Sequence, residues 1–186
     1  DQISEIIINH EKINKKIAKQ KSIELIEKVQ LKNPELVFEK YPFQLSGGQQ
    51  QRVMIAIAIA CKPKLLIADE PTTSLDSLVR NDIISLIKSL QNEYNMSVLF
   101  ISHDLKLVSK FVDNLIVLKK GVIIEKGISS QIFNSPKKKY TKHLIDSSPP
   151  KNNRPNRLIT SKTKKNKLIS KAERATNGFI VEPGEY

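Results

Sequence analysis

The sequence predicts an α/β fold in which helices alternate with the strands of a mostly parallel sheet. Two short apolar runs, 65–68 and 98–101, have the composition of buried strands. A helical pattern over about 77–94 separates them, and strand–helix–strand order is typical of a parallel core. The lysine-rich end of the chain is low in hydrophobic residues and predicts a disordered basic tail over 147–186.

The first 45 residues are predicted to be mainly helical. Residues 2–31 show the spacing of two amphipathic helices, with isoleucines on one side and lysines and glutamates on the other. Pro34 is expected to end this region, because proline breaks a helix interior. Residues 35–45 are expected to form a connector, since Tyr41 precedes a proline and favours an extended backbone.

A capped helix and a strand follow. Ser46 can cap a helix over about 49–61, because its hydroxyl can accept a first-turn N–H, and Pro63 stops that helix. The buried strand 65–68 then ends at two carboxylates.

The third part of the chain repeats this alternation. Asp76 or Ser77 can cap the helix that runs to about residue 94. Strand 98–101 and a short helix over 104–112 come next.

The last elements predicted before the tail are a hairpin and one or two short helices. Residues 114–118 and 122–125 flank a Lys-Lys-Gly turn, which is a hairpin signature. Residues 129–146 are predicted to hold one or two short helices interrupted by Pro136.

The net charge of +12 is concentrated near the C-terminus. Residues 1–136 carry 18 basic and 15 acidic side chains, whereas residues 137–174 carry 13 and 2. The excess of positive charge therefore lies mainly in the tail, and this argues against nucleic-acid binding by the domain itself. For the tail, a solvated extension and attraction to anionic lipid head groups both stay open.

The most informative motif is the run Leu45-Ser46-Gly47-Gly48-Gln49. Its two glycines let backbone N–H groups approach phosphate oxygens closely, and the following helix points its positive end at the same place. A plain capped helix start is the simpler alternative.

Asp69 and Glu70 follow the strand 65–68 directly. A carboxylate at a strand end can hold a nucleotide-bound metal ion, and a neighbouring one can act as a general base. A solvated acidic loop is the alternative. Downstream stand Ser74-Leu75-Asp76, where Asp76 can also be a simple helix cap, and His103 after strand 98–101, where a structural histidine is the alternative.

In order and spacing these motifs resemble the C-terminal half of an ABC-type ATPase domain, a P-loop NTPase. The resemblance implies that Asp69 holds Mg²⁺, that Glu70 activates the attacking water and that His103 contacts the γ-phosphate of ATP. The run Ser46-Gly47-Gly48-Gln49 resembles the signature motif, which implies that it binds ATP held by a second ABC ATPase domain in a dimer. Ser74-Leu75-Asp76 resembles the D-loop, which implies that Asp76 lies at the nucleotide and that this segment couples the two ATP sites across the dimer.

The runs Tyr41-Pro42-Phe43-Gln44 before the signature and Pro71-Thr72-Thr73 after Glu70 narrow the resemblance to the dipeptide and oligopeptide importers. It implies a partial helical subdomain over 1–45 that docks on transmembrane permease subunits, an ATPase core over 46–146, and a cytoplasmic site at the inner face of the plasma membrane. An ATP-hydrolysing subunit of a bacterial peptide importer is the function implied.

The phosphate-cradling pattern G-x-x-x-x-G-K-[ST], which is the Walker-A loop of this family, does not occur in the 186 residues. We therefore expect a truncated or split subunit that hydrolyses little ATP alone, and a separate Walker-A-bearing N-terminal half stays open as a partner. A non-catalytic module that lends its signature motif to another ATPase, or a degenerate remnant, is the main alternative. A nucleic-acid-binding ABC-type ATPase is another, which the importer-like flanks disfavour.

Overall fold

The computed structural model describes residues 1–73 and 75–147, except for the side chain of Lys106. It divides into two compact units, one over Asp1–Leu99 and one that begins at Phe100. The predicted basic tail lies outside the described residues, apart from Ser147. Within the described part of the chain, we find no helix with both the length and the apolar character that a bilayer crossing requires.

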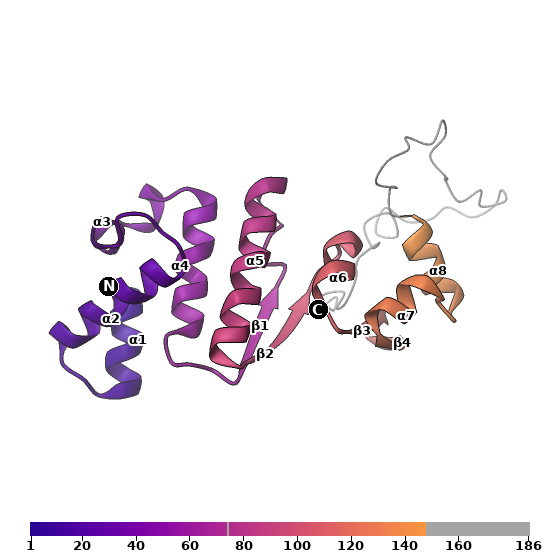
Figure 1. Ribbon diagram of the computed structural model, residues 1–186, viewed down its shortest axis with the longest axis horizontal. Coiled ribbons are helices and arrows are strands. Elements are labelled where there is room, and N and C mark those ends of the chain that lie inside the picture. The colour runs from indigo at the N-terminus through magenta and orange to yellow at the C-terminus, as the bar shows by residue number, and fades with distance from the viewer. Residues whose placement is uncertain (74, 148–186) are drawn as a thin grey trace. The chain divides into compact units, whose positions relative to one another are not determined.

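The first unit holds five α-helices, a short 3₁₀ helix, strand β1 and the start of strand β2 (Figure 1). The elements are α1 (Gln2–Glu11), α2 (Lys15–Lys28), α3 (Pro34–Glu39), η1 (Pro42–Gln44), α4 (Gly47–Ile59), β1 (Leu65–Asp69), α5 (Ser77–Tyr94) and the start of β2 (Ser97–Ile101).

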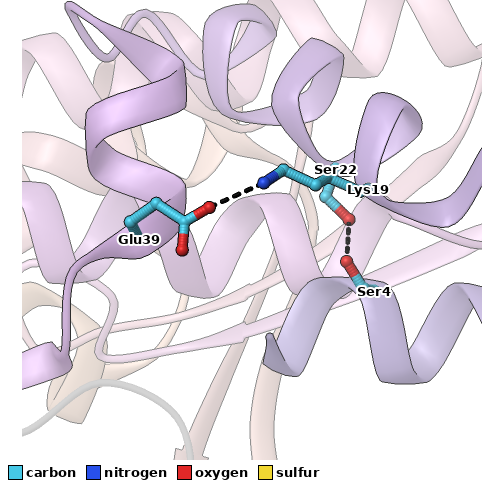
Figure 2. A network of polar contacts seen from close by, with 4 residues as sticks. All are labelled: Ser4, Lys19, Ser22 and Glu39. Atoms are coloured by element: carbon cyan, nitrogen blue, oxygen red, sulfur yellow. Dashed lines mark hydrogen bonds and ion pairs between the residues drawn. The ribbon is translucent and has the colours of Figure 1, made fainter. Parts of the chain in front are cut away.

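The N-terminal helices pack through apolar side chains and a buried polar contact. Ile3 and Ile7 of α1 are buried against α2 and α4. The Ser22 hydroxyl donates to the carbonyl of Ala18 at 2.7 Å and lies 2.8 Å from the Ser4 hydroxyl (Figure 2). A buried hydroxyl without a partner is costly, so this chain of bonds fixes α1 against α2.

The expected connector over 35–45 is wrong, because α3 begins at Pro34 and η1 at Pro42. Proline suits the first helical position, where its missing N–H has no partner to lose. Lys19 of α2 forms a 2.7 Å ion pair with Glu39 of α3 (Figure 2). The Lys19 Nζ also lies 5.0 Å from the centre of the Phe38 ring.

The predicted sheet core is present, but its strands are only half-buried. Strands β1 and β2 form one sheet, and the Ser97 N–H donates to the Lys64 carbonyl at 2.9 Å. This bond places the starts of both strands side by side, as a parallel pair requires. Leu66 is buried, whereas Leu65 and Ile67 are 51% and 60% exposed, because alternate residues of a strand face opposite sides.

Helix α5 is amphipathic and has one buried face. Its buried stripe follows helical spacing and comprises Ile83, Leu86, Ile87 and Leu90. Figure 1 shows α5 next to α4, consistent with the contacts between these two helices.

The second unit is built on an antiparallel hairpin. Its elements are the end of β2, α6 (Leu105–Phe111), β3 (Asn114–Lys119), β4 (Val122–Ile128), α7 (Ser129–Asn134) and α8 (Lys139–Asp146). Lys119 pairs with Val122, and the two turn residues between them have positive φ, 49° at Lys120 and 71° at Gly121. Positive φ at both positions is the geometry of a type I′ hairpin turn, so the predicted hairpin is confirmed.

Glu125 of β4 ties the hairpin to the start of α8. Its carboxylate accepts the backbone N–H groups of Lys137 at 2.8 Å and of Lys138 at 3.2 Å. Partial burial raises the pKa of Glu125, but the Thr141 side chain and these two N–H groups outweigh it and hold the pKa below its usual value.

We expect the Glu125→Gln variant to be less stable than the parent by about 1 kcal/mol near neutral pH, after allowance for solvent screening. A lowered folded-state pKa gives stability that is fully present above the unfolded value of about 4.3 and is lost as pH falls through the folded value. Denaturant unfolding of both proteins between pH 7 and pH 3 should therefore show the difference shrinking at low pH. A constant difference would contradict this role for the carboxylate.

Candidate functional site

Two carboxylates stand at the C-terminal end of β1, as the sequence predicts. Asp69 is the last residue of the strand and is exposed, and half-buried Glu70 follows it. Glu70 has a φ of 45°, in the left-handed region that non-glycine residues seldom occupy. Because such a conformation costs energy, the surrounding turn must hold it, and strained residues of this kind are found often at functional sites.

The turn after Glu70 is closed by two hydrogen bonds between the same two residues. The Thr73 N–H donates to the Glu70 carbonyl at 3.3 Å, and the Thr73 hydroxyl donates to Glu70 Oε2 at 2.5 Å. Pro71 and Thr72 lie buried between them. Thr73 is not among the site residues that the sequence predicts, and the residue pattern carries no specific signal for its contact with Glu70.

The signature run forms the capped helix start that the sequence predicts. The Ser46 hydroxyl accepts the Gln49 N–H at 3.4 Å, and the Ser46 N–H donates to Gln49 Oε1 at 3.0 Å. This reciprocal pair is a capping box. Gly47 and Gly48 occupy the first turn, where N–H groups point out of the helix end towards any bound anion.

Two side chains of α4 fix this helix start, and the sequence analysis assigned neither a role. Gln50 Nε2 donates to the carbonyls of Pro42 at 2.8 Å and of Leu45 at 3.2 Å. Arg52 Nη1 donates to the carbonyl of Val29 at 2.8 Å. All three bonds join α4 to segments earlier in the chain, so they become visible only in the folded structure.

The structure brings the signature glycines together with the segment that carries Asp76. A Cβ atom added at Gly48 would lie 2.8 Å from Val79 Cγ1, and one added at Gly47 would lie 3.7 Å from Leu75 Cδ2. Asp76 Oδ1 accepts the N–H groups of Leu78 and Val79 at 3.0 Å each, so Asp76 caps α5. The helix-cap role that the sequence allows for Asp76 is therefore confirmed.

His103 lies in the second unit, exposed in the loop between β2 and α6. Its neighbours shape this loop: Ser102 Oγ accepts the Asp104 N–H at 3.1 Å, and Asp104 Oδ1 accepts the Leu107 N–H at 3.1 Å. The backbone of His103 thus lies within a turn that follows the end of β2.

The donor set at Asp69 fits Mg²⁺ bound together with a nucleotide. Magnesium dehydrates reluctantly and usually takes one or two protein carboxylates, with water and phosphate oxygens completing its shell. An exposed strand-end carboxylate meets that need. Among residues 1–73 and 75–147, no group of three or more His, Cys, Asp or Glu side chains is placed to hold a metal ion by itself.

Comparison with known proteins points to one family. The family model described as "ABC transporter" matches residues 2–73. The chain is 48% identical over 148 residues to the peptidoglycan transport ATP-binding protein YejF of Agrobacterium fabrum and 45% identical to the oligopeptide transport ATP-binding protein AmiE of Streptococcus pneumoniae. These matches cover 80% of this chain but 27% and 42% of the relatives, so the chain spans less than half of their length.

A solved structure supports the fold. The ATP-binding cassette MJ0796, described as a dimer in a post-hydrolysis state bound to ADP and Pi, is 32% identical to the chain with a TM-score of 0.55. The match covers 63% of this chain and 49% of that one. The fold is therefore that of a P-loop NTPase, as the sequence predicts, and the chain belongs to the family of ABC transporter ATP-binding proteins.

Proposed function

We propose that the chain is the signature-bearing part of an ATP-binding subunit that drives peptide import through a membrane. The observation that carries this proposal is the capped glycine helix start of α4, packed against the segment capped by Asp76. Two relatives of the chain are named for transport of peptidoglycan and of oligopeptides. The matched cassette MJ0796 is dimeric and is bound to ADP and Pi.

Each site residue has a proposed task. Asp69 holds Mg²⁺, which would neutralise phosphate charge when bound. The Glu70 carboxylate accepts a proton from the attacking water, and the His103 imidazole contacts the γ-phosphate. Glu70 can act in this way because its backbone and side chain are both held by the turn to Thr73.

The signature residues serve the ATP of a second ABC ATPase domain in a dimer. The N–H groups of Gly47 and Gly48, with the hydroxyl of Ser46, face outward from the start of α4 and suit a phosphate group. Gln49 keeps the cap closed, and Asp76 holds the neighbouring helix start. The Walker-A loop would come from residues outside these 186, in the same polypeptide or in a separate one.

A permease contact is proposed on the helical region. A cavity of about 470 Å³ opens beside η1, with Val37, Leu45, Val53 and Met54 among its lining residues. Tyr41 and Phe43 are 65% and 82% exposed, and their rings stack with centroids 5.6 Å apart. Exposed apolar groups next to a groove suit a protein partner. We propose that this partner is a permease subunit and that the chain works on the cytoplasmic face of the membrane.

A graft tests the function. Residues 1–147 would replace the matching segment of the oligopeptide transport ATP-binding protein AmiE in cells that lack the native subunit, and uptake of a labelled oligopeptide would be measured. We expect uptake to be restored, and the same graft with Glu70→Gln to be inactive. A graft that assembles and hydrolyses ATP without any uptake would contradict the transport role.

A further inference from the structure

We propose that Thr73 is a positioning residue that holds the Glu70 carboxylate in one orientation through its hydroxyl. The local claim rests on geometry alone. Its catalytic consequence rests on the proposed function of Glu70 as the base for ATP hydrolysis.

The side-chain bond is short and well placed. The Thr73 hydroxyl donates to Glu70 Oε2 at 2.5 Å, within the range of a bond between a hydroxyl and an ionised carboxylate. The Thr73 N–H also donates to the Glu70 carbonyl at 3.3 Å. Thr73 therefore forms hydrogen bonds with both the backbone and the side chain of Glu70.

The turn that carries Thr73 is itself fixed. Pro71 stands at the second position of the four-residue turn, where its ring sets φ in advance. Thr72 is only 4% exposed, and its carbonyl accepts the Leu75 N–H at 3.2 Å. These contacts hold the turn over residues 70–73, and the turn places the Thr73 hydroxyl beside the Glu70 carboxylate.

A fixed hydroxyl matters because a glutamate side chain otherwise samples many rotamers. A bond to Oε2 restricts rotation of the carboxylate and so favours one direction for Oε1. A general base must present an oxygen within hydrogen-bond reach of the water whose proton it takes. The proton passes from that water to Oε1 of Glu70. The Thr73 hydroxyl stays hydrogen-bonded to Oε2 throughout, so Thr73 neither gains nor loses a proton.

The first test measures side-chain order in the full 186-residue chain, without nucleotide. Three-bond NMR couplings about χ1 of Glu70 should report one rotamer in the parent and rotamer averaging in Thr73→Val, which keeps the side-chain shape but removes the donor. Thr73→Ser keeps the donor and should behave as the parent does. Equal averaging in parent and Thr73→Val, or equal order in both, would overturn the proposal.

The second test measures ATP hydrolysis in the grafted transporter subunit. We expect Thr73→Val to lower kcat about tenfold and to leave the KM for ATP within about twofold, because a misplaced base affects the transition state and not ground-state binding. Thr73→Ser should keep most of the parent's kcat. An unchanged kcat in Thr73→Val would overturn the catalytic part, whereas a parent graft that hydrolyses no ATP would refute the proposed function and leave the NMR result to judge the bond.

Discussion

Replacing Glu70 with glutamine is expected to lower ATP hydrolysis by the grafted subunit at least about 100-fold, while MgATP binding stays near the parent's. Glutamine matches glutamate in shape but has no negative charge and cannot take a proton from water. Positioned general bases contribute about 10²- to 10⁴-fold to rates. Phosphate release under saturating ATP, together with a nucleotide-binding titration, measures the two quantities separately.

Glu24→Gln is the matched control for this experiment. Glu24 lies exposed on α2 and accepts a hydrogen bond from Gln20 at 3.2 Å, on a helix that is separate from β1. We expect this variant to hydrolyse ATP at the parent's rate. If Glu70→Gln also kept that rate, another group would have to be the base, and the assignment of Glu70 would be wrong.

The second large effect is expected from a single methyl group at Gly48. The Cβ atom of Gly48→Ala would lie 2.8 Å from Val79 Cγ1, closer than such atoms approach in folded proteins. Overpacking of this kind costs about 1–3 kcal/mol, which outweighs the gain of up to about 1 kcal/mol from alanine in a helix. Denaturant unfolding of the full chain, followed by circular dichroism, should show a lower midpoint.

Gly47→Ala is the control, because its Cβ would meet Leu75 Cδ2 at an ordinary 3.7 Å. We expect this variant to be as stable as the parent or slightly more stable. The double change Gly48→Ala with Val79→Ala should recover part of the loss, since it removes the clashing methyl group. Equal stability of the two single glycine variants would mean that close packing does not explain Gly48.

The local parts of this site could be predicted from the sequence because they depend on short-range chemistry. Ser46 caps α4 and Asp76 caps α5, since each has a side-chain oxygen one position before a helix. The hairpin turn at Lys120 and Gly121 could be predicted because Gly121 adopts positive φ readily and lies between two apolar runs. The strand that ends at Asp69 follows from its apolar run.

Other features depend on contacts that a linear pattern does not contain. Helix α3 was missed because Pro34 can equally stop one helix or start another. The exposure of Leu65 and Ile67 depends on which face of the sheet is covered, and an apolar run of residues does not indicate which face that is. The bond from Arg52 to the carbonyl of Val29 joins residues 23 positions apart.

We propose that Asp69 and Glu70 serve one ATP site of an ABC ATPase dimer and that the signature run serves the ATP bound by the second domain. A MgATP titration of the chain, alone and mixed with the Walker-A-bearing N-terminal segment of a related importer subunit, tests this most directly. We predict little binding by the chain alone, and both binding and hydrolysis in the mixture, with hydrolysis lost in Glu70→Gln. Tight binding by the chain alone, or no binding and no hydrolysis in the mixture, would contradict the account.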